Sequence, residues 1–286
     1  MKVSVVYLIW VPYGVTLFQD FVISYKKHNS GSEHRLILLF NGVNDLNDTN
    51  PFHAVAKQFD LSYESFYKKN GLDLEAYFWL AKQFDSRYFL FLNSFSLILD
   101  NDWLLKLMKH MNSSKAGIIS PSGSYQSYYS TVFLNNSWRW DKSKSLKENY
   151  LKYKLLLKAI FYWRFLFPPF PDQHIRTNAF LITRKLFLSL RINSLKNKFM
   201  AYQLESGYKS MTRQIIEKGY DVLVVDKNGK AYKISEWNKA NIFWKGNQED
   251  LLIGDKQTEY YRSSNDATRN KLRQLAWGES ILPIKK

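Results

Sequence analysis

The sequence predicts an α/β fold, in which a mostly parallel sheet is flanked by helices. In the first 120 residues, short apolar runs alternate with segments whose apolar residues recur every three or four positions. Several of the apolar runs end abruptly in small polar residues, as strands do where their carboxyl ends face a ligand. The chain has 286 residues, of which 45% are hydrophobic, so it can bury a large core.

Strands and helices alternate along the first half of the chain. Residues 3–10 form a continuous apolar run that is typical of a buried strand, and residues 16–28 have helical spacing. Further strands are predicted at residues 34–40, 59–63, 88–92 and 116–120, and further helices at residues 73–84 and 102–111. The carboxyl ends of these parallel strands should lie along one crevice.

The regular alternation stops after residue 120. We interpret the chain as a single domain, residues 1–286, with a first half of residues 1–120 and a second half of residues 121–286. Strands are predicted in the second half at residues 175–183 and 221–225.

A basic, aromatic helix is predicted at residues 142–167. Its apolar residues fall at three- and four-residue steps and its lysines lie off that face; the apolar residues are Leu146, Tyr150, Tyr153, Leu157 and Phe161. Two interpretations remain open. The apolar face packs on the protein's own core, or the helix lies in a membrane interface.

The composition and the net charge limit which partners and which cellular compartment fit this chain. No apolar run approaches the roughly 20 residues of a membrane-spanning helix, and the apolar start, followed by Pro12 and Gly14, indicates a strand and not a signal peptide. The absence of cysteine excludes disulfides and suits a cytoplasmic protein. The formal net charge of +16 predicts an anionic partner: a nucleotide diphosphate, an anionic membrane surface or nucleic acid. Nucleic acid is disfavoured because zinc-finger spacing and an RNA-binding signature are missing.

Two segments carry most of the functional information. Residues 88–96 are an apolar strand that ends in Asn93, Ser94 and Ser96, and residues 205–214 combine a carboxylate, a glycine, hydroxyls and a guanidinium. Together they resemble nucleotide-sugar-dependent glycosyltransferases of the GT-A fold, family 2 type. The resemblance implies a nucleotide-sugar donor in the first half and a saccharide or lipid-linked saccharide acceptor in the second. It also implies a role in bacterial surface polysaccharide synthesis, such as lipopolysaccharide O-antigen or capsule, by a cytoplasmic enzyme peripheral to the inner face of the plasma membrane.

The resemblance assigns donor-binding residues to the strand ends. In the family the first two strand ends hold the nucleotide base, and an asparagine-glycine segment, here Asn70-Gly71, opens a later helix. The residues expected to bind the donor are Trp10, Pro12, Asn41, Asn44, Gly71, Asn93, Ser94 and Ser96. Each of them taken singly also fits an ordinary loop residue.

The sequence departs from the family at the metal site. The family ends its fourth strand in Asp-X-Asp, which binds Mg²⁺ or Mn²⁺ on the diphosphate, whereas this chain has Asn93-Ser94-Phe95. Asp100 and Asp102 come too late and fit the start of the next helix. Three accounts remain open: a metal-independent enzyme that binds the diphosphate through Lys, Arg and backbone donors, a metal bound by other residues, or a GT-A-like binding subunit of an assembly complex without transferase activity.

Glu205 is the candidate catalytic base, because the resemblance implies an inverting enzyme whose base lies at the start of a helix near this position. The alternative is a carboxylate that caps helix N–H groups. Residues expected near the acceptor or the diphosphate are Arg176, Asn178, Ser206, Ser210, Arg213 and Asp255. Simpler interpretations also exist for neighbouring residues. Ser210 and Thr212 fit positions on a helix surface, and His174 fits an ordinary surface histidine. Trp237 and Trp244 fit either core packing or stacking on sugars.

Overall fold

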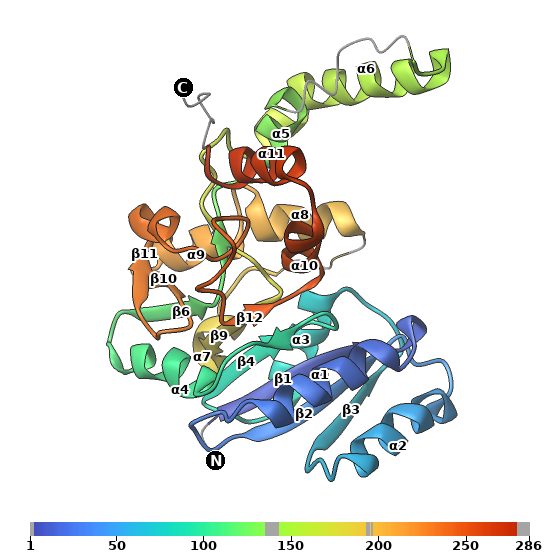
Figure 1. Ribbon diagram of the computed structural model, residues 1–286, viewed down its shortest axis with the longest axis vertical. Helices are drawn as coiled ribbons and strands as arrows, with labels where there is room; N and C mark the ends of the chain where they lie inside the picture. The colour runs from blue at the N-terminus through green and yellow to red at the C-terminus, as the bar shows by residue number, and fades with distance from the viewer. Residues whose placement is uncertain (1–2, 135–142, 193–194, 196, 279–286) are drawn as a thin grey trace.

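The computed structural model describes residues 3–134, 143–192, 195 and 197–278 of the protein (Figure 1). Within these residues the main sheet has eight strands, in the order β11-β10-β6-β9-β4-β1-β2-β3. These strands are β1 (Val3–Trp10), β2 (Arg35–Asn41), β3 (Glu64–Lys68), β4 (Tyr88–Leu92), β6 (Ala116–Ser120), β9 (Ala179–Thr183), β10 (Asp221–Val225) and β11 (Ala231–Lys233). Two short pairs flank the sheet: β5 (Leu97–Ile98) with β12 (Ile253–Gly254), and β7 (Gly123–Ser124) with β8 (His174–Ile175).

Most strands of the main sheet run in one direction. β1 is parallel to β2 and β4, β2 is parallel to β3, and β10 is parallel to β6. β9 is antiparallel to both β4 and β6, and β11 is antiparallel to β10. The predicted α/β fold with a mostly parallel sheet flanked by helices is therefore confirmed. The division into a donor half and an acceptor half stays a prediction.

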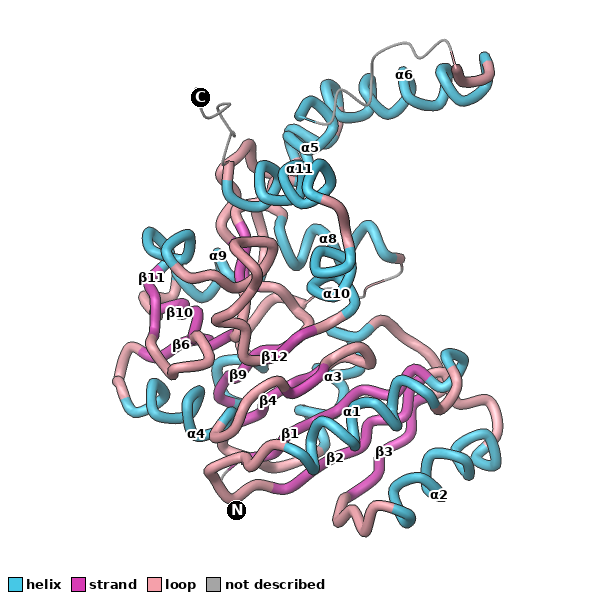
Figure 2. Tube along the Cα trace, viewed as in Figure 1, coloured by secondary structure: helices cyan, strands magenta, loops and turns pink. Residues whose placement is uncertain are grey.

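Helices cover both faces of the sheet, because neighbouring residues of each buried strand point to opposite faces. On one face lie α1 (Thr16–Lys27), α2 (Asn50–Gln58) and α4 (Trp103–Met108). On the other face lie α3 (Asp73–Gln83), α7 (Arg184–Leu188), α8 (Lys198–Ser206), α9 (Met211–Glu217), α10 (Lys256–Ser263) and α11 (Asp266–Trp277). In β1, Val5 and Tyr7 face the first set and Val6 and Leu8 the second. Figure 2 shows these layers.

The strand predicted at residues 59–63 is wrong. The third strand is β3, Glu64–Lys68, and residues 59–63 pack against the core as the end of α2 and the turn behind it. β3 is the edge strand and is only partly buried, so it carries charges at both ends and lacks the continuous apolar run of the inner strands. The helix predicted at residues 102–111 is also shorter, because a 3-10 turn, Lys109–Asn112, follows α4.

The predicted basic helix is α6 (Leu146–Phe161), which follows α5 (Tyr128–Leu134) and precedes a 3-10 turn, Trp163–Phe165. Residue 142, at the predicted start, lies outside the described residues. The apolar face defined from the sequence is exposed along its whole length, so the interpretation that it packs on the protein's own core is wrong. No helix in the described part of the chain is both long and apolar enough to cross a bilayer.

Candidate functional site

The carboxyl ends of β1, β2 and β4 meet at one edge of the sheet. Trp10 is in register with Asn41. The Ser94 hydroxyl accepts a hydrogen bond from the Trp10 N–H (3.1 Å) and donates one to the Leu8 carbonyl (2.9 Å). Tyr7 donates its hydroxyl proton to the Ser94 carbonyl (2.7 Å). Ser94 therefore joins the ends of β1 and β4 through a hydroxyl that both accepts and donates.

The structure brings two of the other expected donor residues together. The fully buried Asn41 side chain donates through Nδ2 to the Gly71 carbonyl (2.8 Å) and accepts from the Gly42 N–H (3.1 Å). Pro12 and Asn44 are exposed beside this pair of strand ends. A shallow recess beside β1 is lined by Trp10, Tyr13, Phe52 and others. It is far too small to enclose a nucleotide base, so a base needs the exposed residues as well.

Residues 93–96, which we call the β4 turn, satisfy one another's polar groups. The Asn93 Oδ1 accepts from the Phe95 N–H (3.0 Å) and from the Ser96 hydroxyl (3.1 Å). The Asn93 N–H and the Ser96 hydroxyl both donate to the Asn178 carbonyl, at 2.9 Å and 2.8 Å. Among the described groups, none accepts from the Asn93 Nδ2, which is open to solvent. The turn thus offers an amide donor, and no carboxylate, at this strand end.

A lysine that sequence reasoning missed lies next to the β4 turn. The exposed Lys256, the first residue of α10, holds its Nζ 5.5 Å from the centre of the Phe95 ring. Phe95 also contacts the Tyr13 ring, with the ring centres 5.4 Å apart. Lys256 is far from the β4 turn in the sequence, and only the pairing of β12 with β5 brings it there. Its charge makes this corner of the crevice attractive to an anion.

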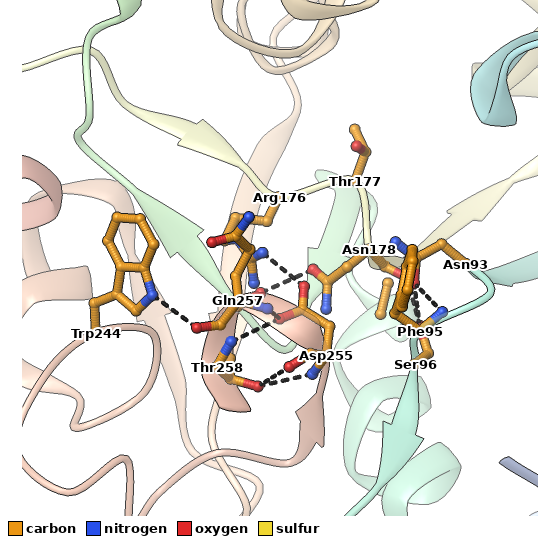
Figure 3. Close-up of polar contacts among 12 residues, drawn as sticks. Asn93, Phe95, Ser96, Arg176, Thr177, Asn178, Trp244, Asp255, Gln257 and Thr258 are labelled. Atoms are coloured by element: carbon orange, nitrogen blue, oxygen red, sulfur yellow. Dashed lines mark hydrogen bonds and ion pairs between the residues drawn. The ribbon is translucent and has the colours of Figure 1, made fainter. Parts of the chain in front are cut away.

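Arg176 and Asp255 form a buried ion pair behind the β4 turn (Figure 3). Arg176 Nη2 lies 2.6 Å from Asp255 Oδ2, and the guanidinium stacks on the Phe243 ring at 3.8 Å. The other Asp255 oxygen accepts from the N–H groups of Gln257 and Thr258, both at 3.0 Å, and so caps α10. Asp255 therefore fixes Arg176 and the start of α10, and neither of its oxygens is left for a ligand.

Two buried donors in this region have no hydrogen-bond partner among the described residues. They are Arg176 Nη1 and Asn178 Nδ2, and Figure 3 shows both side chains beside Asp255. The Asn178 Oδ1, in contrast, accepts from the Ser122 hydroxyl (3.1 Å). Because more than nine in ten buried polar groups in proteins are paired, two neighbouring unpaired donors indicate a place where a water molecule or an anion belongs.

Glu205 lies in the last turn of α8, facing residues 172–178, which we call the 172–178 loop. Its Oε1 accepts from the Thr177 N–H (3.1 Å) and hydroxyl (3.3 Å). Its Oε2 makes no hydrogen bond to the described residues and is open to solvent. A carboxylate at a helix C-terminus opposes the helix dipole, so the alternative that Glu205 caps a helix start is wrong. The expected position at the start of a helix is wrong as well; Ser210 holds that place.

The 172–178 loop carries two further titratable groups near Glu205. Burial raises the pKa of Asp172 to about 7, although Arg213 Nη2 lies 3.1 Å from its Oδ1 and acts in the opposite direction. Burial lowers the pKa of His174, whose Nδ1 donates to the Asp172 carbonyl (2.8 Å). His174 is therefore a buried, neutral histidine, and the interpretation as a surface residue is wrong.

The remaining expected residues have local partners. The Ser206 hydroxyl donates to the Tyr202 carbonyl (3.2 Å), and Ser210 caps α9 by accepting from the Arg213 N–H (3.4 Å). Thr212 and Ser210 are fully buried, so their assignment to a helix surface is wrong. Trp237 and Trp244 are buried as well, which confirms core packing for both.

The residues present do not fit a divalent cation of the Asp-X-Asp type. Phe95 cannot ligate, and the Asn93 Oδ1 and the Ser94 and Ser96 hydroxyls are already bonded within the protein. Within the described ranges no three His, Asp or Glu side chains come together as a metal cluster. Asp102 is the N-cap residue of α4, so the expected position at the start of the next helix is confirmed, but its side chain makes no capping hydrogen bond; Asp100 lies 2.8 Å from Lys106 Nζ instead.

Comparison with known proteins gives similarity in structure only. No protein-family model and no curated protein matches the sequence. A mannosyltransferase from Pyrobaculum calidifontis, in complex with GDP-Man and Mn²⁺, is 11% identical with a TM-score of 0.49, over 78% of this chain and 54% of that one. S. aureus TarS 1–349, in complex with UDP-GlcNAc, is 16% identical with a TM-score of 0.31, over 42% and 34%. A cytidylyltransferase from Leptospira borgpetersenii is 12% identical with a TM-score of 0.36, over 66% and 63%. The chain thus spans less than two thirds of each, and scores below 0.5 carry no argument about activity.

Proposed function

We propose that the protein is an inverting, nucleotide-sugar-dependent glycosyltransferase of GT-A type. The observation that carries the proposal is Glu205, a carboxylate with one oxygen held by Thr177 and the other open to solvent. Thr177 directly precedes Asn178, whose carbonyl binds the β4 turn, so this carboxylate and the exposed donors of that turn belong to one polar region. A base and an anion site in one crevice are what sugar transfer from a nucleotide diphosphate requires.

Each residue of the site has a role in this reaction. The open Oε2 of Glu205 takes the proton from the acceptor hydroxyl. The hydroxyl oxygen then forms a bond to the anomeric carbon of the donor, on the face opposite the diphosphate. The bond between that carbon and the diphosphate oxygen breaks, and the nucleoside diphosphate leaves with the electron pair. The Thr177 N–H fixes the direction of the base throughout.

Nitrogen donors take the place of a metal on the diphosphate in this proposal. Lys256 Nζ and Asn93 Nδ2 are exposed and contact the phosphate oxygens directly. Arg176 and Asn178 lie behind them and contribute buried N–H dipoles and, for Arg176, a charge held by Asp255. Trp10, Pro12, Asn41, Asn44 and Gly71 form the base end, which Ser94 holds together. Ser206, Ser210 and Arg213 hold the acceptor side from α8 and α9.

The proposal extends to the acceptor and its location. We assign the acceptor to a saccharide or lipid-linked saccharide of a bacterial surface polysaccharide, such as lipopolysaccharide O-antigen or capsule. The enzyme then works in the cytoplasm at the inner face of the plasma membrane. The net charge of +16 supports an anionic surface and an anionic donor as partners.

A second function is favoured by the Asn93-Ser94-Phe95 sequence alone. Loss of both metal-binding carboxylates is also expected of a catalytically inactive, GT-A-like binding subunit of a polysaccharide assembly complex. Such a subunit binds the donor or the saccharide but transfers nothing. The two functions therefore differ in turnover and not in donor binding.

A thermal-shift screen against nucleotide sugars tests the donor site. The purified protein is heated with UDP-, GDP-, CDP- and dTDP-linked sugars, each with Mn²⁺ or with a chelator. A donor at about 100 times its Kd stabilises the protein by about 2.7 kcal/mol. We expect one donor to stabilise the protein equally in Mn²⁺ and in chelator. Stabilisation that disappears in chelator contradicts metal independence, and no shift with any donor contradicts the proposed function.

A charge-matched pair of variants makes the screen specific to the crevice. Lys256→Gln removes the exposed charge beside Phe95 and should weaken donor binding by about 10- to 100-fold, as expected for one charged hydrogen bond of about 1.5–3 kcal/mol. Lys218→Gln removes an exposed charge behind α9 and should leave the Kd unchanged. Equal effects of both variants would assign the weakening to net charge and remove Lys256 from the site.

A further inference from the structure

The helix α6 presents a stripe of large apolar side chains to solvent. We call this the α6 stripe; its residues are 40 to 76% exposed and are Leu146, Tyr150, Tyr153, Leu157 and Phe161. Part of the other side of α6 is packed, since Ala159 is fully buried in a small core cluster with Trp163 and Phe167, whereas Leu151 and Leu155 are 50% and 47% exposed. Figures 1 and 2 show α6 projecting from the layers that enclose the sheet. A surface helix ordinarily turns its apolar stripe toward the core, so this orientation needs another explanation.

Basic residues accompany the α6 stripe. Residues 144–164 contain six basic side chains and one acidic one, Glu148. The Glu148 carboxylate is engaged at the start of the helix, where it accepts from the Ser145 N–H and hydroxyl, both at 2.9 Å. Lys147, Lys154 and Lys158 recur at steps of seven and four residues, so they form a row along one flank of the stripe, and all three are exposed.

Aromatic side chains extend the apolar surface beyond the helix. Tyr162 and Phe165 are both more than half exposed. The guanidinium of Arg164 lies 4.6 Å from the Phe165 ring centre. Tyr and other aromatic rings that stand beside lysines and arginines are typical of protein surfaces at the level of lipid headgroups.

We propose that α6 lies in the interface of an anionic lipid bilayer, with the α6 stripe in the acyl boundary and the row of lysines at the headgroups. The charge decides between the possible occupants. A second copy of this chain would present the same lysines and stripe, and the like charges would repel, whereas an anionic bilayer complements both the charge and the apolar surface. Each basic residue near such a surface contributes about 1 kcal/mol.

The packing of α6 links this surface to Glu205. Phe199 of α8 contacts Trp163 and Phe167, with ring centres 6.2 Å and 5.6 Å apart. The Tyr208 N–H, just after α8, donates to the Leu166 carbonyl (3.0 Å). Docking through α6 therefore holds the helix that carries Glu205 close to the bilayer, and a lipid-linked acceptor would reach it there. This last step rests on the proposed function, but the lipid binding does not.

Vesicle co-sedimentation of the full-length protein tests the proposal. The vesicles contain either phosphatidylcholine alone or phosphatidylcholine with phosphatidylglycerol, at low and at high salt. We expect binding to the anionic vesicles that weakens with salt. Lys147→Gln, Lys154→Gln and Lys158→Gln combined should weaken it on the order of 100-fold, since about 1 kcal/mol each corresponds to about fivefold each. The matched control Lys57→Gln, Lys115→Gln and Lys218→Gln changes net charge equally at exposed sites elsewhere and should weaken it less than about threefold.

A second pair of variants tests the apolar part. Tyr153→Ser, Leu157→Ser and Phe161→Ser combined should abolish sedimentation with vesicles, whereas Ile23→Ser, Leu105→Ser and Tyr260→Ser, at other exposed apolar positions, should not. Circular dichroism and the midpoint of thermal unfolding without ligand confirm that each variant is folded. Vesicle binding that survives the stripe variant overturns the proposal. A second outcome also overturns the proposal: the wild-type protein binds no vesicle, and light scattering shows that it is a dimer whereas the stripe variant is a monomer. The α6 stripe would then be a contact between two copies of the chain. The donor screen is independent of both results.

Discussion

The β4 turn and the 172–178 loop lie side by side at the same edge of the sheet, but they differ in whether their polar side-chain atoms have hydrogen-bond partners within the protein. In the β4 turn, Asn93 Oδ1 and the Ser94 and Ser96 hydroxyls bond to the protein's own groups. In the 172–178 loop, Arg176 Nη1, Asp172 Oδ2 and Asn178 Nδ2 are buried without a partner within the described chain.

The difference separates a framework from a candidate reaction site. A turn whose carbonyl oxygen and hydroxyls bond to the protein's own groups holds strands together, and it leaves only the Asn93 Nδ2 for a ligand. Buried unpaired polar groups lower the stability of the loop that carries them. Proteins retain such groups where a ligand or a reaction uses them. Substitutions in the two segments should therefore affect different properties, stability in the first and catalysis or titration in the second.

Glu205→Gln should give the largest effect on the loop side of this comparison. Loss of a general base lowers kcat by about 10²–10⁴-fold, because the acceptor proton is no longer removed in the transition state. The glutamine Oε1 can still accept from the Thr177 N–H, so the free energy of unfolding and the donor Kd should stay unchanged. Initial rates with the donor found in the screen, together with its binding constant, measure both properties.

The control for this prediction is Glu217→Gln. Glu217 ends α9 and is exposed, so its substitution removes an equal charge away from the crevice. Full activity of Glu205→Gln would exclude Glu205 as the base. Equal loss in both variants would point to charge and not to proton transfer. Donor binding without turnover in the wild-type protein, with every natural acceptor tried, would favour the binding subunit.

Ser94→Ala should break the framework side. Removing the Ser94 hydroxyl leaves the Trp10 N–H and the Leu8 carbonyl without their partner, so we expect a loss of about 3 kcal/mol in the free energy of unfolding. The donor Kd should change little where the protein is folded. Urea unfolding gives the first quantity, and Ser114→Ala, at an exposed serine, should cost less than about 0.5 kcal/mol. A stable Ser94→Ala with weakened donor binding would make Ser94 a direct ligand.

The inner strands were predictable because burial on both faces leaves a continuous apolar run. β1 and β4 follow the sequence prediction at both ends. β3 was missed because an edge strand is half exposed and can carry Glu64 and Lys68 at its ends. The spacing of α6 was also readable, but the environment of its apolar face was not. Helical periodicity shows that a stripe exists and not what covers it.

The candidate site was predictable only where the residues lie close together in the sequence. Glu205 stands out because it is an isolated acid among small polar residues. Its partner Thr177 comes from a different segment, and nothing local in the sequence marks that contact. Lys256 was missed for the same reason, since its place beside Phe95 depends on the pairing of β5 with β12. The sequence favoured Asp255 as a ligand, whereas the exposed charge belongs to the next residue, Lys256.

Asp172→Asn should give the smallest effect. It tests whether ionisation of the buried Asp172 lowers the free energy of unfolding as the pH rises. Burial raises the pKa of Asp172 to about 7, so between its ordinary value near 3.8 and about 7 the folded protein holds a proton that the unfolded chain has lost. Stability from this group is therefore present at low pH and is lost as the pH rises through about 7. Asparagine mimics the protonated form and can still accept from Arg213. From pH 5 to pH 8 the free energy of unfolding should fall on the order of 2 kcal/mol more for the wild type than for Asp172→Asn.

Urea unfolding at both pH values measures the difference, and Asp85→Asn, at a fully exposed aspartate, should follow the wild type. Parallel curves for Asp172→Asn and the wild type would show that Arg213 keeps Asp172 ionised throughout, and the contrast with the β4 turn would then rest on Arg176 and Asn178 alone.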